Sequence, residues 1–260
     1  MGTRRRLATV ALLLLAVGVL AATAGAEVVG SGVVRITFHA TFSPTSLPRE
    51  RPAPIAVEVD GQISTTDGSQ PPALQTLRVE LTSSGKIDTV GLPACTASAL
   101  QSTSSELALE RCGPAQVGHG KFEANLQFGA KPILVDGRAL VFNGIVGGRP
   151  GMFIHIYISR PVRVTLVIPI KISRGSGRFG TVLTTRVPEL AGGVGSITEL
   201  KLRIGRRYSY RGRSHSYLSA ACTAPKGFPG ATFTFAKGVF GFAGGRSLST
   251  FVSRSCQVRN

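Results

Sequence analysis

Short runs in which apolar and polar residues alternate recur through most of this chain, and they restrict the folds open to it. In residues 34–40 every second residue is apolar, as in a strand that turns one face to a core. Similar runs, rich in β-branched or aromatic residues, lie at 77–81, 121–126, 153–159, 164–172, 181–187, 197–204, 217–222, 231–242 and 248–253. A period of two over so much of the chain predicts an all-β protein.

The connections between these runs are suited to tight turns. Gly147-Gly148 and Gly244-Gly245 are natural turn pairs, and Arg211-Gly212 fits the tip of a hairpin. Strands about 8–12 residues apart with such turns favour an antiparallel β-sandwich, jelly-roll-like, with an open barrel as the alternative. Hydrophobic residues make up 43% of the chain, which excludes a disordered protein. No loop is long enough to mark a domain boundary, so we expect a single β domain over residues 27–260.

One segment departs from the strand pattern. Residues 96–112 favour a short helical excursion, because Thr103 and Glu106 have the spacing of a capping box. Gly113-Pro114 follows and is typical of a helix end. Cys95 and Cys112 bracket the excursion, so a disulfide there would hold it against the sheet.

The first 26 residues have the pattern of a signal peptide. A positive start at Arg4–Arg6 precedes an apolar stretch, and Ala24-Gly25-Ala26 fits a cleavage site. We therefore expect residues 1–26 to be removed and Glu27 to begin the mature chain, with an uncleaved membrane anchor as the alternative. The Leu-rich core favours Sec export over the twin-arginine route. We therefore expect a secreted or cell-envelope protein whose mature chain has no membrane span.

The four cysteines agree with export. An even number of cysteines in an exported chain indicates disulfides, and four allow three pairings. We favour Cys95 with Cys112 and Cys222 with Cys256, because each pair closes a local loop. A zinc site is disfavoured, since there is no C-x-x-C spacing and the four histidines are scattered.

Basic residues gather in the C-terminal half. Residues 27–136 hold 8 Lys or Arg against 11 Asp or Glu, whereas residues 137–260 hold 19 against 2. A half-chain this basic should attract polyanions through salt-sensitive forces. Outside a cell the partner would be an anionic envelope polymer or glycan, and no specific nucleic-acid partner is predicted. The alternative is a generally basic surface without a partner.

Several short motifs resemble a family of exported β-rich proteins from high-GC actinobacteria. They are Leu47-Pro48-Arg49, TDGSQPPAL at 66–74, GLPAC at 91–95, Cys112 with AQVGHG at 115–120, and Phe142-Asn143-Gly144. The resemblance covers most of the mature chain and implies export and a single β unit. It implies no activity, cofactor or partner.

The usual catalytic patterns are weak or absent. Glu58 and Asp60 lie two residues apart and would share a strand face, as a glycosidase pair requires, but we favour two solvated carboxylates on an exposed strand face. There is no G-x-S-x-G elbow, and no phosphate-binding or dinucleotide motif that would indicate a cofactor. By alternation His155 shares a strand face with Phe153 and Tyr157, which favours a half-buried aromatic face. The sequence therefore leans away from an enzyme.

An arginine- and tyrosine-rich hairpin is the strongest candidate for ligand binding. Its candidate residues are Arg206, Arg207, Tyr208, Tyr210, Arg211, Arg213 and Tyr217. Arginine can grip phosphate or carboxylate groups, and tyrosine rings can stack on sugars or bases. An ordinary surface hairpin whose tyrosines cover a sheet edge is the alternative.

Three classes of function remain open. The first is a non-enzymatic exported protein that interacts with anionic cell-envelope polymers. The second is a carbohydrate-active enzyme of jelly-roll type that uses Glu58, Asp60 or Glu80. The third is a carrier of a small apolar ligand, for which we expect an enclosed pocket lined by residues such as Phe153, Phe179 and Phe233.

Overall fold

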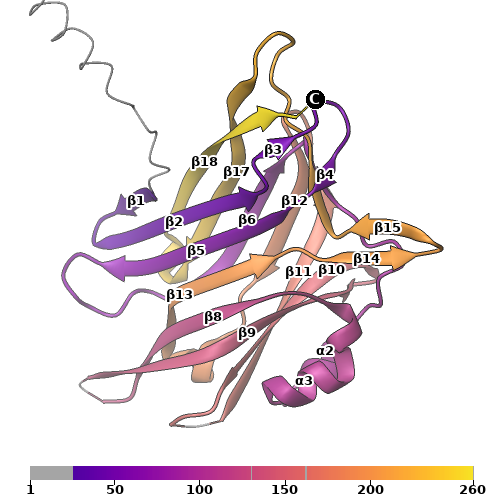
Figure 1. Cartoon of the computed structure of the whole chain (residues 1–260). Coiled ribbons are helices and arrows are strands. Elements are labelled where there is room, and N and C mark those ends of the chain that lie inside the picture. Colours follow the sequence, from indigo (N-terminus) through magenta and orange to yellow (C-terminus); the bar gives the residue numbers. More distant parts are fainter. Residues whose placement is uncertain (1–25, 130, 162, 260) are drawn as a thin grey trace, which may run out of the picture.

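Thirteen strands form one large sheet that curls around an apolar interior (Figure 1). The computed structural model describes residues 26–129, 131–161 and 163–259. The strands of this sheet are β1 (Glu27–Ser31), β2 (Val34–Ser43), β3 (Ser46–Leu47), β5 (Ala56–Thr65), β6 (Leu74–Thr82), β8 (Gln116–Gln127), β9 (Pro132–Val146), β10 (Arg149–Ile158), β11 (Val164–Arg174), β12 (Phe179–Arg186), β13 (Gly195–Ile204), β17 (Gly230–Phe242) and β18 (Ser247–Val258). The all-β class that the alternation predicts is confirmed.

Neighbouring strands in this sheet are antiparallel, except that β3 pairs in parallel with the end of β18. Their order is β1-β2-β5-β13-β8-β9-β10-β11-β12-β6-β17-β18-β3. Strand β9 is missing from the predicted runs because both faces of its second half, residues 139–144, are covered. Val141 packs into the sheet interior, while Leu140 and Phe142 belong to a second, smaller cluster. A strand buried on both faces has no alternation to detect.

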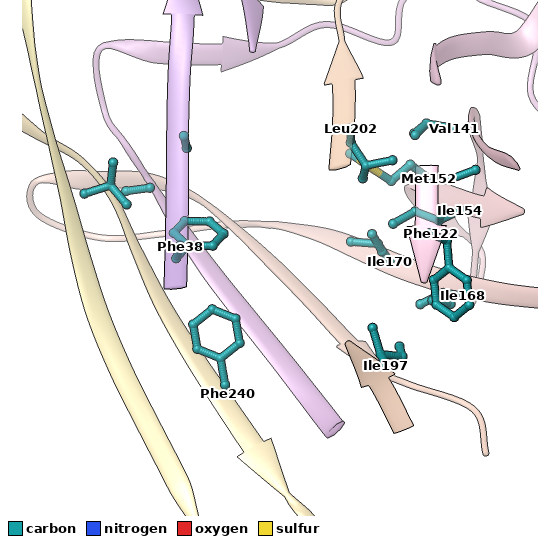
Figure 2. Packing of buried hydrophobic residues seen from close by; sticks show 14 of the residues in the cluster. Phe38, Phe122, Val141, Met152, Ile154, Ile168, Ile170, Ile197, Leu202 and Phe240 are labelled. Carbon is teal, nitrogen blue, oxygen red and sulfur yellow. The ribbon is translucent and has the colours of Figure 1, made fainter. Parts of the chain in front are cut away.

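The inward residues of the strands form the main core. On β2 the burial alternates strictly, with Val34, Ile36, Phe38, Ala40 and Phe42 on the inner side. Figure 2 shows Phe38 and Phe240, from opposite ends of the sheet order, pointing toward one another. Their ring centroids lie 5.8 Å apart in an edge-on arrangement. Such aromatic pairs contribute about 0.5–1.5 kcal/mol beyond the area they bury.

The two ends of the sheet meet at Arg254 on β18. Strand β1 lies beside β18, and the Arg254 guanidinium donates to both carboxylate oxygens of Glu27, at 2.7 and 3.3 Å. Its Nε also donates to the carbonyl oxygen of Ala40 on β2. Arg254 is only 7% exposed, so a buried charge is held by a forked pair and a backbone acceptor. These contacts cover edge groups that would otherwise be open to another chain.

A small three-stranded sheet, called the cap sheet below, lies against one end of the curled sheet. It consists of β4 (Ala53–Pro54), β16 (Leu218–Ala220) and β7 (Gly85–Ile87), in the order β4-β16-β7. The predicted Cys222–Cys256 disulfide is confirmed, with a Cα–Cα distance of 5.8 Å. It ties the chain just after β16 to β18, so the cap sheet is fixed to the closing strand.

The predicted helical excursion is confirmed as two short helices, α2 (Ala97–Leu100) and α3 (Ser105–Cys112), followed by the 3-10 turn η1 (Gly113–Ala115). They lie on the outside of the sheet against β9 and β10 (Figure 1). The predicted Cys95–Cys112 disulfide holds them there. The capping prediction is wrong by one residue: the Ser104 hydroxyl accepts from the Leu107 N–H, whereas Thr103 is buried and bonds to the sheet.

Two disulfides fit an oxidising compartment, such as the outside of a cell. In the part of the chain that the structure describes, no helix has the length and apolar character that a membrane crossing requires. The predicted signal peptide, with its alternatives, lies almost entirely in residues 1–25, outside the described residues.

Replacing Arg254 by Ala should lower the free energy of unfolding by about 2–4 kcal/mol, because it leaves the Ala40 carbonyl and the partly buried Glu27 carboxylate without their partner. Urea unfolding followed by circular dichroism measures this loss. Arg186→Ala, at an exposed site on β12, is the control and should stay within about 0.5 kcal/mol of the wild type. Equal stabilities of the two variants would show that the Arg254 contacts do not hold the sheet closed.

Candidate functional site

The inner face of the curled sheet is not fully packed. Val59, Val79, Leu183 and Leu200, on β5, β6, β12 and β13, face inward and yet remain only half-buried. Inward residues elsewhere, such as Phe122 on β8, are completely buried. Apolar side chains that point inward and still have accessible surface must border an unfilled space.

That space is a cavity of about 210 Å³. Strands β2, β5, β6, β10, β11, β12, β13 and β17 and the cap strands β7 and β16 contribute to its lining. The few polar side chains are Gln62, Thr82, Lys86, Thr181, Thr185 and Ser219. For comparison, an engineered apolar cavity of about 150 Å³ stays dry and binds benzene. The cavity is therefore large enough for a small apolar molecule.

The cavity is lined by other aromatic residues than the sequence predicts. Phe235 and Phe240 contribute to its wall. Phe153 instead packs in the cluster beneath the helices, and Phe233 packs against Phe42. Phe179 lies beneath the Arg178 guanidinium. The expectation of an apolar pocket agrees with the structure, but the three phenylalanines named for it are wrong, because alternation alone does not say which side of a strand is the interior.

The arginine- and tyrosine-rich segment forms the predicted hairpin, from β14 (Arg207–Tyr210) and β15 (Arg213–Ser216). Its tip has φ angles of 50° at Arg211 and 71° at Gly212, both in the left-handed region. Consecutive positive φ angles are typical of a type I′ turn, which matches the twist of a two-residue hairpin. The predicted hairpin tip is therefore confirmed.

The tyrosines of this hairpin are largely used for packing. The Tyr208 hydroxyl donates to the Val90 carbonyl at 2.7 Å, and its ring stacks on His215 with centroids 5.4 Å apart. The Tyr210 ring lies so close to Gly91 that a side chain at that glycine would clash with it. Tyr217 is 0% exposed, so its inclusion in a surface ligand site is wrong: it belongs to the main core.

The arginines of the hairpin divide into two groups. Arg211 and Arg213 are exposed near the tip. Arg206 and Arg207 lie at the base and border a groove of about 250 Å³ together with Arg203. The remaining groove residues are Ser43, Pro44, Pro54, Ile55, Ala56, Gly205 and Ser216, none of which is acidic. The structure therefore separates a cationic groove from a cationic tip within the segment that the sequence singled out.

The three carboxylates proposed for glycoside hydrolysis do not form one site. Glu58 pairs with Arg203, and Asp60 lies 3.5 Å from the Lys201 ammonium, both on the outer face of β5 and β13. Glu80 pairs with Arg78 on β6, which is separated from β5 by six strands in the sheet order. Each carboxylate forms an ion pair with a basic neighbour on a convex surface. The hypothesis of a carbohydrate-active enzyme that uses these carboxylates therefore has no geometric support.

His155 is buried between β10 and the helical excursion, more deeply than the predicted half-buried face. Its Nε2 lies 3.0 Å from the Thr103 hydroxyl oxygen and 3.2 Å from the Thr103 carbonyl. Because Thr103 Oγ1 donates to the Leu100 carbonyl, Nε2 carries the proton and donates. Burial lowers the pKa of His155, since the charged ring would lose its hydration. The side chain thus holds the excursion to the sheet as a neutral group.

Within the described ranges, no three His, Cys, Asp or Glu side chains gather closely enough to hold a metal ion. No family model, curated protein or solved structure matches this chain. The resemblance to exported actinobacterial proteins therefore stays a prediction, and the function has to be argued from the cavity and the groove.

Acidification should weaken the fold through His155. The unfolded histidine takes up a proton near pH 6.5, whereas the buried ring takes it up only at lower pH, so the unfolded state binds more protons below pH 6.5. The free energy of unfolding should then fall by up to about 1.4 kcal/mol per pH unit. Urea unfolding between pH 7 and pH 5 measures this slope.

His155→Gln should remove most of the slope, because glutamine keeps a donor near Thr103 without titrating in this range. His119→Gln, which removes a solvent-exposed histidine, is the control. The assignment is wrong if the His155 variant keeps the slope of the wild type.

Proposed function

We propose that this protein is a non-catalytic carrier that binds a small apolar molecule inside the curled sheet. The observation that carries the proposal is the cavity of about 210 Å³, whose lining is mainly apolar. Each methylene group transferred from water to such a lining contributes about 0.8 kcal/mol, so a small hydrocarbon chain would bind measurably. Among the described residues that line it, none is Asp, Glu or His, which supports binding over acid–base catalysis.

We further propose that the carrier acts outside the cytoplasm. Sec export with removal of residues 1–26 would deliver it there, and the two disulfides support an oxidising environment. This proposal agrees with the prediction of a secreted or envelope-associated protein. It also agrees with what the resemblance to exported actinobacterial proteins implies.

Val79→Phe should abolish or strongly weaken binding of octan-1-ol, because the larger ring fills the cavity from β6. Isothermal titration calorimetry measures the affinity. Val239→Phe is the matched control: it makes the same substitution on the neighbouring strand β17, opposite Arg78, at a position outside the cavity lining. Val239→Phe should therefore bind octan-1-ol as the wild type does. If the wild-type protein takes up no octan-1-ol, or if both variants bind equally, the cavity is not a binding site.

Interaction with an anionic envelope polymer is a second candidate function, supported by the exposed arginines of the β14–β15 hairpin. Arg211 and Arg213 project near the tip and take part in no ion pair with a described residue. Cationic side chains of this kind bind phosphate polymers by releasing counterions, which makes the affinity salt-dependent. The tip of the hairpin would then attach the carrier to an envelope polymer, apart from the cavity that binds the ligand.

Replacing Arg211 and Arg213 together by Gln should weaken binding to polyphosphate and reduce the slope of log affinity against log salt by about 1.5, since each lost contact removes about 0.7–0.9. Salt-titrated binding measured by fluorescence anisotropy tests this, with Arg186→Gln, which removes an exposed arginine of β12 outside the hairpin, as the control. An unchanged salt slope in the double variant would remove the hairpin tip as a polyanion site.

A further inference from the structure

The cavity and the cationic groove are adjacent. Ile55 lines both of them, and it is 7% exposed. The Ile55 N–H donates to the Leu218 carbonyl at 3.0 Å, which fixes this residue at the junction of β5 and the cap sheet. Next to it, Val57 lines the cavity while Ala56 lines the groove. The same alternation on β13 places Ile204 in the cavity wall and Arg203 in the groove wall.

The groove has positive charge that its own residues do not neutralise. The Arg206 guanidinium donates to the carbonyl oxygens of Pro114 and Gln116, at 2.7 and 2.9 Å, so it is positioned by neutral acceptors and keeps its charge. Arg203 is paired with Glu58. Arg207 is exposed, and no described carboxylate forms an ion pair with it. Two guanidinium groups thus remain for an incoming anion, and one of them is held in place.

We propose that the ligand is an anionic amphiphile, whose apolar chain occupies the cavity and whose carboxylate, or another anionic group of similar size, lies in the groove at Arg206 and Arg207. The inference rests on the proposed function, since it specifies the class of molecule that the cavity takes. The two compartments differ as the two ends of such a molecule do: the cavity is lined mainly by apolar side chains, whereas the groove contains three arginines and no acid. Guanidinium groups suit this role because they donate in a fork that matches a carboxylate.

The side chain of Ile55 lies between the head and the chain of such a ligand. Because its side chain contributes to both walls, we expect a chain that enters the cavity from the groove to move it aside. A rotation about one side-chain bond is an ordinary event in a protein on a fast timescale. Ile55 thus lies at the boundary between the apolar cavity and the cationic groove.

A matched pair of ligands tests the proposal with the full mature protein. Octanoate and octan-1-ol have chains of equal length and differ in the charge of the head group. Isothermal titration calorimetry at low salt should show octanoate binding about tenfold more tightly, the effect of roughly one charge-assisted hydrogen-bonded pair. The affinity for octanoate should fall as salt is added, while the affinity for octan-1-ol should not.

Arg207→Gln should reduce the affinity for octanoate about tenfold and leave octan-1-ol binding unchanged. Arg213→Gln is the control, because it removes an exposed arginine of the same hairpin that does not line the groove. Val79→Phe should weaken binding of both ligands, which shows that the octanoate chain lies in the cavity and not only in the groove.

The outcomes separate the two proposals. Suppose that octan-1-ol binds and that Val79→Phe weakens its binding. If octanoate then binds no more tightly than octan-1-ol, or if Arg207→Gln leaves the affinity for octanoate unchanged, the head-group site is overturned and the apolar carrier stands. An equal loss with Arg213→Gln also overturns it, since the effect would then be one of general charge. If neither ligand binds, the carrier function fails and the inference fails with it.

Discussion

The curled sheet depends on the closure of its two ends. A sheet with an apolar inner face is stable only if that face is covered, and here the β1–β2 end is brought over β17 and β18 to cover it. Phe38 and Phe240 provide apolar contact across this junction, and the Arg254 guanidinium joins β18 to the Glu27 carboxylate and the Ala40 carbonyl. If these contacts were lost, the edges and the interior would both be exposed, and neither the cavity nor the cap sheet would have a fixed wall.

The number of strands explains why a cavity remains. The diameter of a closed sheet grows with strand number, and about eight strands leave an interior that side chains just fill. This sheet has thirteen, and aromatic rings fill only parts of its interior. Val79 and Leu183 are paired neighbours on β6 and β12, and together with Val59 on β5 they line the space that remains. The unfilled volume therefore lies beneath the cap sheet, next to the base of the arginine-rich hairpin.

The candidate site was only partly predictable. A cluster of arginine and tyrosine around a glycine turn identified the hairpin from local sequence, and both cysteine pairs followed from loop length. The division of the arginines between the groove and the hairpin tip could not be predicted from the sequence. Arg206 is positioned by the carbonyl groups of Pro114 and Gln116, some ninety residues away in the chain. Tyr217 has the same local pattern as its exposed neighbours, yet it is completely buried in the main core. Such assignments depend on contacts between distant segments.

The sequence by itself determined the all-β class, the helical excursion at 96–112, the two disulfides and the hairpin tip, since each depends on local periodicity, turn chemistry or short loops. Strand order, the closure at Arg254, the cavity and its adjacent groove were decided by the tertiary structure. The physical reason is that alternation shows that a strand has one buried face but not what that face meets. A filled core and an apolar cavity need the same pattern of residues, and only the number and order of the strands decide between them.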